Sequence, residues 1–323
     1  MDLATKAFLI SVGTVDVPRQ GGSREMSTAG PGAGGQSVFF RSGDRIVRLG
    51  VVSGSPLRLE RRKEGYAILK GDMEIAEGLL VEPLLHCPEQ AYITVSERCI
   101  YDCKFCAVPR LRGRVKSGQA IRRMVEGAQK TGRLRAISLT SGVEASPEHE
   151  GRRVAEIVAD LRSFGVPVGV SVSPFPGVNR MLKDAGADEV KYNLESVDGD
   201  LFQRVCPGIS FEGIWEALAE AVEIFGRDRV FSNVIVGLGE SDRVLRSGID
   251  ELAEMGVLPV LRAVYPHPLR AGEVQMTRPS AQRLLDLADY LKRALEKNEL
   301  RGDMALTGCY RCTGCDLAPG RDL

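Results

Sequence analysis

Short apolar runs rich in β-branched residues alternate with longer amphipathic stretches from residue 90 onward. The longer stretches, among them GRRVAEIVADLRSFG, FEGIWEALAEAVEIFG and RVLRSGIDELAEMG, are apolar at three- and four-residue spacing and end near a glycine, which is typical of helices. The short runs predict six buried strands, at YITVSE (92–97), AISLT (136–140), VPVGVSVS (166–173), EVKYNL (189–194), VFSNVIVG (230–237) and VLPVLRAVY (257–265). Because strands and helices alternate, we expect an α/β protein with a parallel sheet.

Six strand-helix units predict either a doubly wound sheet or an incomplete barrel, and in both folds chemistry sits at the carboxyl ends of the strands. Residues 1–87 follow a different pattern, since SVFFRSGDRIVRLGVV and LRLERRKEGYAILKG predict short strands separated by turns. We therefore expect a small β-rich N-terminal extension over 1–87. Within it, GGSREMSTAGPGAGGQ (21–36) predicts a mobile loop; it could cradle a phosphate, but it lacks the Lys-Ser/Thr ending of a P-loop.

Composition narrows the possible partners and compartment. The 323 residues are 43% apolar, which suffices for a sizeable core, and the 43 Lys and Arg balance the 43 Asp and Glu. This balance gives no reason to expect a nucleic-acid or membrane partner. No segment approaches the roughly 18 apolar residues of a membrane span, so we expect a cytoplasmic protein. In that reducing compartment the eight cysteines, six of them in two tight clusters, favour metal or cluster ligation over disulfides.

The first cluster, Cys99, Cys103 and Cys106, has the spacing C-x3-C-x2-C and directly follows the first predicted strand of the alternating region. A structural zinc site needs four ligands, whereas this loop offers three thiolates and no nearby histidine. Three cysteines suit a [4Fe–4S] cluster that leaves one iron open to a non-protein ligand. A degenerate zinc loop or a chance trio is the alternative interpretation.

This spacing at this position resembles the radical S-adenosylmethionine superfamily. The resemblance implies a partial (β/α)6 TIM-type barrel over 88–297, and an open iron that is chelated by S-adenosylmethionine. It also implies that cluster reduction generates a 5′-deoxyadenosyl radical. In this family the later strand ends bind the cofactor, and the positions here that match are Phe105 in the cluster loop, Ser141 and Gly142 in LTSGVE, Asn193 and Glu195 in KYNLES, and Val236 and Gly237 in VIVGLGES. Arg204 either pairs with the methionyl carboxylate or faces solvent.

The second cluster lies in TGCYRCTGCDLAPG and comprises Cys309, Cys312 and Cys315. Its C-x2-C-x2-C spacing resembles the ligand runs of ferredoxin-type clusters, so we expect the C-terminal segment 298–323 to hold a second [4Fe–4S] cluster. A zinc site is the alternative. Three thiolates leave one ligand to be found, and the possibilities are Cys206, Cys87, a Ser or Thr of the N-terminal loop, or an exogenous ligand.

The segments ADEVKYNLESVDGDLFQRVCPG and SNVIVGLGES narrow the resemblance to the lipoyl synthase and biotin synthase branch. A standard biotin synthase is disfavoured, because Ser171 or Ser173 and Phe231 stand where it needs cysteines for a [2Fe–2S] cluster. Lipoyl synthases generally have an arginine where this chain has Cys206, and their auxiliary cysteines precede the barrel. The C-terminal cysteine run fits better the two-component archaeal-type lipoyl synthases.

This resemblance implies sulfur insertion into an unactivated C–H bond of an octanoyl-lysyl chain, with the auxiliary cluster as sulfur donor. We expect the C-terminal tail to fold back over the strand ends so that substrate and both clusters meet. The implied partners are an octanoylated lipoyl domain or glycine-cleavage H-type protein, a second lipoyl synthase subunit, and a reducing ferredoxin or flavodoxin. Two alternatives stay open: another radical reaction, such as methylation or dehydrogenation, in which the second cluster carries electrons, or a non-catalytic electron-transfer scaffold.

Several further residues have a functional and a structural interpretation. Arg110, Arg112, Arg114 and Lys116 either attract an acidic carrier domain or form a solvated loop. His267, between two prolines, is interpreted as structural, and Cys87 and Cys206 as ordinary buried thiols unless one of them ligates the second cluster.

Overall fold

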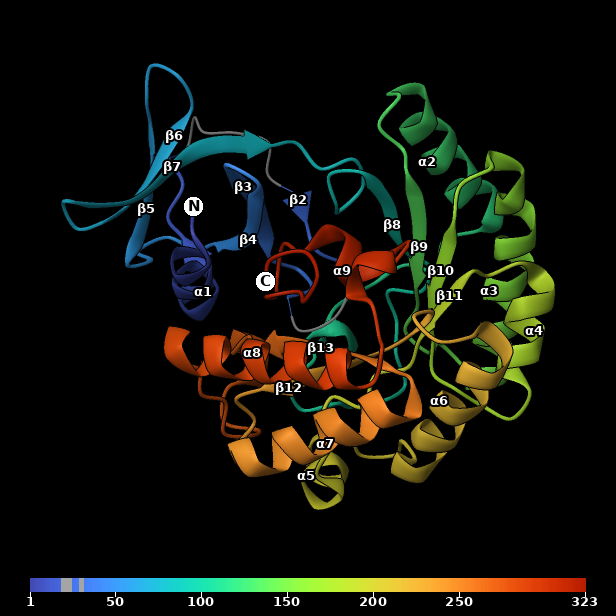
Figure 1. The fold of residues 1–323 in the computed structure, drawn as a ribbon. Helices are drawn as coiled ribbons and strands as arrows, with labels where there is room; N and C mark the ends of the chain where they lie inside the picture. Colours follow the sequence, from blue (N-terminus) through green and yellow to red (C-terminus); the bar gives the residue numbers. More distant parts are fainter. Residues whose placement is uncertain (19–24, 29–31) are drawn as a thin grey trace.

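The computed structural model describes residues 1–18, 25–28 and 32–323, so part of the glycine-rich stretch 21–36 lies outside the described residues. Its centre is a six-stranded parallel sheet in which the strands follow one another in chain order (Figure 1). In the described chain the two edge strands, β8 and β13, do not pair with each other, and the sheet forms the expected partial barrel. The strands are β8 (Gln90–Thr94), β9 (Ala136–Thr140), β10 (Val168–Ser171), β11 (Glu189–Lys191), β12 (Val230–Val236) and β13 (Leu258–Ala263).

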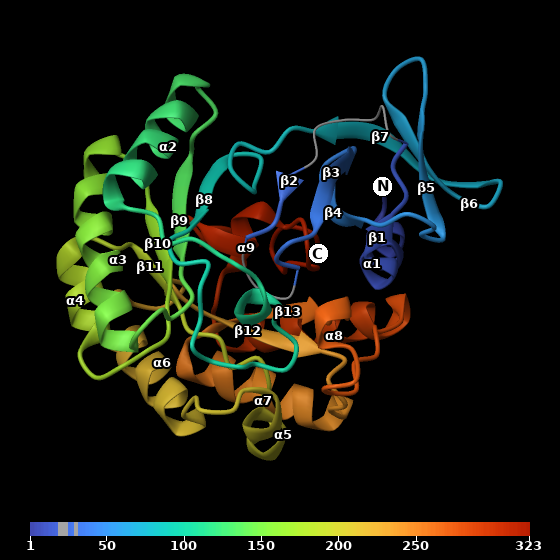
Figure 2. The ribbon, with the colours of Figure 1, turned by 180° about the vertical axis from the view of Figure 1, so that it is seen from behind.

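Amphipathic helices cover the outer face of these strands (Figures 1 and 2). Five of them begin where a serine side chain accepts a hydrogen bond from the first turn, as Ser117, Ser146, Ser210, Ser241 and Ser280 do, and each such cap stabilises its helix by about 1 kcal/mol. The other two begin after Gly177 and Asp198. The helices after the strands are α2 (Gly118–Lys130), α3 (Pro147–Leu161), α4 (Val178–Ala185), α5 (Gly199–Val205), α6 (Phe211–Phe225), α7 (Asp242–Met255) and α8 (Ala281–Lys297).

Each of the six predicted strands overlaps an observed one, but several, among them the first, third and fourth, stop before their apolar pattern does. Regular pairing of β11 stops at Lys191, whereas the pattern predicts a strand to residue 194. Glu195 then takes a left-handed φ of 58°, which is uncommon outside glycine, and pairs through a single bridge with Val234. The end of this strand is therefore bent rather than extended.

The N-terminal part forms its own largely antiparallel sheet. The order is β1-β4-β3-β7-β6-β5, and β2 pairs with β3. The sequence pattern did not predict α1 (Leu3–Val12), whose Leu9 and Ile10 share a core with Leu284 and Ala288 of α8. The strands are β1 (Thr14–Val15), β2 (Glu25–Met26), β3 (Gln36–Ser42), β4 (Arg45–Val51), β5 (Leu57–Arg61), β6 (Tyr66–Lys70) and β7 (Met73–Val81).

The C-terminal segment, with the short helix α9 (Gly308–Cys312), lies between the two sheets (Figures 1 and 2). The Gly308 amide donates to the side chain of Gln90 (2.8 Å), and the Thr307 amide donates to the Glu189 carboxylate (2.8 Å). Gln90 and Glu189 are the first residues of β8 and β11. The expectation that the tail folds back over the carboxyl ends was therefore wrong: the tail enters from the amino ends, where these buried acceptors satisfy its amides.

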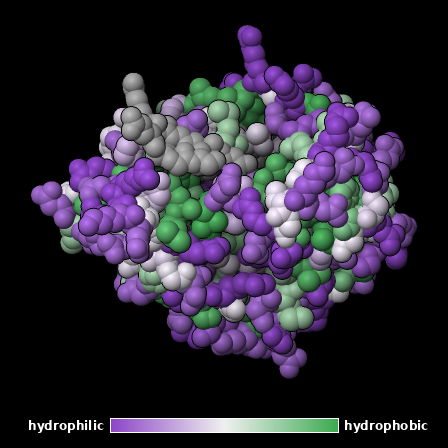
Figure 3. All heavy atoms as spheres, turned by 90° about the horizontal axis from the view of Figure 1, so that it is seen from above, coloured by the Kyte–Doolittle hydropathy of each residue, from purple (hydrophilic) through white to green (hydrophobic). Residues whose placement is uncertain are grey.

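In the part of the chain that the structure describes, no helix is long and apolar enough to cross a bilayer. Hydrophilic residues cover much of the face seen in Figure 3, and hydrophobic residues appear there as patches between them.

Candidate active site

The first cysteine trio lies on the loop that follows β8, at the carboxyl end of the sheet. Cys99, Cys103 and Cys106 are all partly buried. Backbone hydrogen bonds fix the loop, because Ile100 N donates to Val143 O and Lys104 N donates to Val205 O, each at 2.7 Å. The loop is thus tied to two other parts of the barrel, after β9 and at the end of α5.

The side chain of Arg270 also fixes this loop, and the sequence pattern did not predict this role. Its side chain is completely buried, and its Nε donates to the Cys106 carbonyl (2.7 Å). Its Nη1 lies 2.7 Å from the Asp102 carboxylate and 2.9 Å from that of Glu273. Hydrogen bonds from Lys104 and Arg270 lower the pKa of Asp102 to about 2, so this carboxylate is charged at neutral pH. No sequence motif marks such a residue, since its partner Cys106 is distant along the chain.

Burial sets the chemistry of the three thiols. It raises the pKa of Cys106 to about 12 and also raises that of Cys99. The thiolates that metals require are therefore unfavourable here without a cation, and metal binding supplies that positive charge. Cys206, at the end of α5, is buried with its thiol in hydrogen-bonding contact with Cys103, so the structure places it at the first trio.

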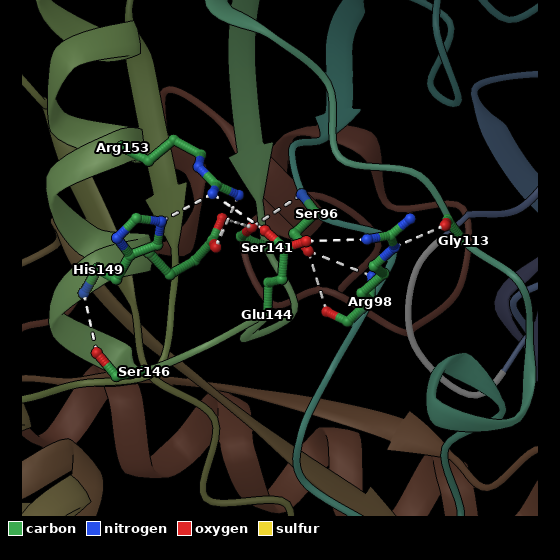
Figure 4. A network of polar contacts seen from close by, with 9 residues as sticks. Ser96, Arg98, Gly113, Ser141, Glu144, Ser146, His149 and Arg153 are labelled. Atoms are coloured by element: carbon green, nitrogen blue, oxygen red, sulfur yellow. Dashed lines mark hydrogen bonds and ion pairs between the residues drawn. The ribbon is translucent and has the colours of Figure 1, made fainter.

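The turn after β9 supports the base of the cysteine loop (Figure 4). Ser141 Oγ accepts from Ser96 N (2.9 Å) and donates to the buried Glu150 carboxylate (2.5 Å). A Cβ atom on Gly142 would lie 2.3 Å from the Arg98 carbonyl oxygen, so only glycine fits there. The small residues of this turn are thus explained by close packing against the cysteine loop. In the described structure Ser141 serves the scaffold.

Polar residues beyond the end of β11 line a cavity of about 230 Å³. Asn193 and Glu195 face this cavity together, as their alternation predicts, and Asn233 of β12 lies with them. The side-chain oxygens of Asn193 and Asn233 are buried and have no hydrogen-bond partner among the described residues. Burial raises the pKa of Glu195 to about 7. Because buried acceptors are normally satisfied, these two oxygens fit a ligand that donates hydrogen bonds.

The other residues predicted from the sequence for the first site do not line this cavity, and these include the first cysteine trio, Ser141 and Gly142. Phe105 packs in the barrel core, and Arg204 is exposed on α5. Val236 is fully buried, and its carbonyl accepts from Val264 N (2.9 Å). Gly237 has a φ of 113°, and a Cβ there would lie 2.2 Å from the Thr277 carbonyl oxygen. The chain itself, rather than a planar ligand ring, therefore already requires glycine at this position.

The second cysteine trio lines the same cavity. Cys309, Cys312 and Cys315 reach it from the C-terminal segment. Arg262 Nη1 lies 3.4 Å from the Cys309 sulfur, and Lys191 Nζ lies 4.0 Å from it. Positive charges at these distances favour thiolates or an anionic cluster.

The Glu195 charge acts on Cys106 of the first trio and on Lys191, whose Nζ lies 4.0 Å from the Cys309 sulfur of the second trio. Among the described residues, no three His, Cys, Asp or Glu side chains are gathered at the spacing that would hold a single metal ion. Both trios nevertheless have the donor chemistry of iron–sulfur ligands, because each presents partly buried thiols.

Comparison with known proteins places this geometry in context. The radical SAM superfamily profile matches residues 93–252. Lipoyl synthase from Histophilus somni (strain 2336) is 26% identical over 179 residues, which cover 53% of this chain and 55% of the relative. Bacteriochlorophyllide c C-7(1)-hydroxylase from Chlorobaculum limnaeum is 30% identical over 134 residues, covering 40% of this chain and 33% of that enzyme. The chain thus spans about half, or less, of the length of these curated relatives.

Among solved structures, methylornithine synthase is similar in fold. Its TM-score is 0.55 at 16% sequence identity, and the match covers 65% of this chain and 62% of that one. At this identity the likeness shows the barrel architecture alone.

Proposed function

Since this chain belongs to the radical S-adenosylmethionine superfamily, in its lipoyl synthase-like branch, we propose that it inserts sulfur into an unactivated C–H bond of an octanoyl chain on a carrier lysine. One observation carries the proposal. The C-terminal cysteines line the same cavity as Asn193 and Glu195, the strand-end residues that match the family's cofactor-binding positions. Cys99, Cys103 and Cys106 are not among the residues that line this cavity, so the proposal requires a cofactor bound at Asn193 and Glu195 to bring the radical to the space that the C-terminal cysteines line.

In this proposal Cys99, Cys103 and Cys106 hold the [4Fe–4S] cluster that the family implies. With S-adenosylmethionine bound, that cluster supplies a primary carbon radical, which can remove hydrogen from an alkyl chain where no side-chain base can. Arg270 and the Ser141 turn keep the cysteine loop in place. The unpartnered oxygens of Asn193 and Asn233 accept hydrogen bonds from the cofactor's hydroxyl and amino groups.

The cavity also has an apolar side that suits an alkyl chain. Ile10 and Phe39 from the N-terminal part line it together with Ile235 and Val264 of the barrel. Burying each methylene of an octanoyl chain against such a wall contributes about 0.8 kcal/mol. Cys309, Cys312 and Cys315 would hold the second [4Fe–4S] cluster at this cavity. That cluster would supply the sulfur atom and, as ferric iron, the acceptor for the electron released when the carbon–sulfur bond forms.

The basic loop after the first trio gives limited support for carrier docking. Arg110 is paired with Glu273 (3.3 Å), and Lys116 is paired with Glu97. Arg112 and Arg114 are exposed and form no ion pair with the described residues. We assign these two to an acidic octanoylated lipoyl domain or H-type protein. A second lipoyl synthase subunit and a ferredoxin or flavodoxin reductant complete the proposed partners.

A second function is favoured by the hydroxylase relative, whose identity to this chain, at 30%, exceeds the 26% of the lipoyl synthase. In that alternative the chain catalyses another radical reaction, and the second cluster transfers electrons instead of losing sulfide. The two functions differ in the fate of the second cluster.

The test is an anaerobic single-turnover reaction of the reconstituted protein with S-adenosylmethionine, dithionite and an octanoyl-lysyl peptide. Mass spectrometry reads 5′-deoxyadenosine and sulfur on the peptide. We expect both products from the native protein, deoxyadenosine alone from Cys312→Ala, and neither from Cys106→Ala. Deoxyadenosine without peptide sulfur from the native protein, with and without a second subunit, would contradict sulfur insertion and favour the alternative.

A further inference from the structure

A fourth cysteine, far from the C-terminal trio in sequence, opens onto the same cavity wall. Cys87 comes from the connection between β7 and β8, and it lines the cavity with Cys309, Cys312 and Cys315. We propose that Cys87 is the fourth protein ligand of the second cluster, so that this centre is a four-cysteine [4Fe–4S] site. This inference rests on the proposed function only in taking the C-terminal trio as cluster ligands.

The position of Cys87 is fixed by contacts on both sides. It is 4% exposed, and its thiol is in hydrogen-bonding contact with that of Cys312. The charges of Cys309 and Cys315 also act on it. In a cubane cluster each thiolate binds a different iron, so the four sulfur atoms need not converge on one point as they do around a single ion.

An unusual backbone conformation at His86 orients Cys87. His86 has a φ of 70°, which non-glycine residues rarely adopt and which persists only where surrounding contacts enforce it. The contacts are local: Leu84 N donates to Cys87 O (2.7 Å), and Tyr92 N donates to Leu85 O (2.9 Å). This unusual turn sets His86 and Cys87 on the cavity wall immediately before β8 begins.

The charge around the four thiols suits this ligand set. Four thiolates outweigh the positive charge of an oxidised [4Fe–4S] core, and a buried net negative charge requires compensation. The Arg262 guanidinium and the Lys191 ammonium stand at 3.4 Å and 4.0 Å from the Cys309 sulfur. These two cations offset the net negative charge of a cluster with four thiolates.

The other possible ligands are placed less well. Cys206 contacts Cys103 and therefore belongs to the first trio. Ser27 and Ser37 line the cavity, but the Ser37 hydroxyl already accepts from Arg48 Nε (2.9 Å). Oxygen is also a poorer ligand than thiolate for iron–sulfur clusters.

The experiment isolates the second cluster in the full chain by replacing Cys99, Cys103 and Cys106 with alanine. This background protein is reconstituted anaerobically and measured for iron per chain, EPR and Mössbauer spectra. Cys87→Ala is then added, with Cys206→Ala as the matched buried-cysteine control and Cys87→Ser as the conservative replacement. Circular dichroism verifies that each variant is folded.

We expect about four irons per chain in the background protein and in the Cys206→Ala control. Cys87→Ala should lose at least one iron and give a three-iron EPR signal, or lose the cluster, while Cys87→Ser should retain iron with shifted spectra. Unchanged iron content and spectra in folded Cys87→Ala would overturn the inference. That failure is distinct from failure of the proposed function, in which an intact four-iron second cluster transfers no sulfur.

Discussion

The two cysteine sites of this protein are built in different ways. The first lies on one continuous loop, and its three cysteines fall within eight residues of sequence. The second joins the C-terminal segment to Cys87 and to cations from β11 and β13, which only the folded chain brings together. A local site can be recognised from its spacing, whereas an assembled site depends on the packing of the whole molecule.

The difference also concerns stability. The first loop is held by backbone bonds within the barrel and by the buried Arg270. The second trio depends on a tail that lies between two sheets and is anchored through Gln90, Glu189 and Lys6. We therefore expect perturbation of the N-terminal part to affect the second site before the first.

The largest expected effect is on radical formation at the first site. Cys106→Ala removes a ligand, and because loss of outer-shell partners alone costs about 10–100-fold, we expect 5′-deoxyadenosine formation to fall by more than about 100-fold. The second site should still bind its iron. Liquid chromatography of the nucleoside and iron analysis measure both. Equal loss of iron from both sites would contradict their independence.

The second prediction breaks the anchor of the tail. Lys6 Nζ lies 2.7 Å from Asp322, and both side chains are almost fully buried. Lys6→Met leaves the buried Asp322 carboxylate with only the Ala318 amide (2.9 Å) and Arg45 Nε (4.0 Å) as partners, so the free energy of unfolding should fall by about 3 kcal/mol. Urea denaturation of the cluster-free protein measures this change, and iron analysis should show selective loss at the second site. Lys292→Met, which removes the exposed pair with Glu296, is the control and should cost less than about 1 kcal/mol.

The third prediction concerns the residue that holds the first loop. Arg270→Met removes the bonds to the Cys106 carbonyl, Asp102 and Glu273, and we expect cluster affinity at the first site to fall about 10–100-fold. Iron-chelator competition in a Cys309→Ala, Cys312→Ala and Cys315→Ala background measures this affinity. The control Arg110→Met removes a half-exposed cation that faces the same carboxylates, and it should change affinity by a factor of about two. Equal effects of the two substitutions would refute the positioning role of Arg270.

The fourth and smallest effect is the pH dependence of stability that comes from Glu195. Burial raises the pKa of Glu195 from 4.5 to about 7, so the folded protein holds this proton more tightly than the unfolded chain does. The resulting stabilisation is complete below about pH 4.5 and is lost as the pH rises to about 7. The free energy of unfolding of cluster-free protein should therefore decrease over this window by on the order of 2 kcal/mol more than in Glu195→Gln. Urea denaturation at pH 5 and pH 7.5 measures the difference, and the exposed Glu216→Gln should follow the native protein.

The sequence pattern predicted most of the barrel. Its strands are buried β-branched runs, and five of its helices begin at serine caps, so local residue choice and final structure agree there. The exceptions have identifiable causes. The bend at Glu195 follows a backbone conformation that a strand pattern cannot reveal, and α1 gains its stability from packing on α8 rather than from a strong pattern of its own.

The candidate site was predictable only in part for the same reason. Two-residue alternation placed Asn193 and Glu195 on one face, and the cysteine spacing marked both trios. Arg270 and the position of Cys87 depend on contacts between residues far apart in sequence, which no periodicity encodes. The direction of the tail was misjudged because the acceptors that bind it, Gln90 and Glu189, look like ordinary strand residues.

The most direct test of the central claim follows the sulfur atom itself. Protein reconstituted with heavy-isotope sulfide is transferred to sulfide-free buffer and given S-adenosylmethionine, reductant and the octanoyl-lysyl peptide. Mass spectrometry of the peptide then identifies the isotope. We predict heavy sulfur on the octanoyl chain, and its absence from the product of Cys312→Ala. Deoxyadenosine accompanied by an unmodified peptide, or by sulfur of natural isotopic composition, would contradict the account.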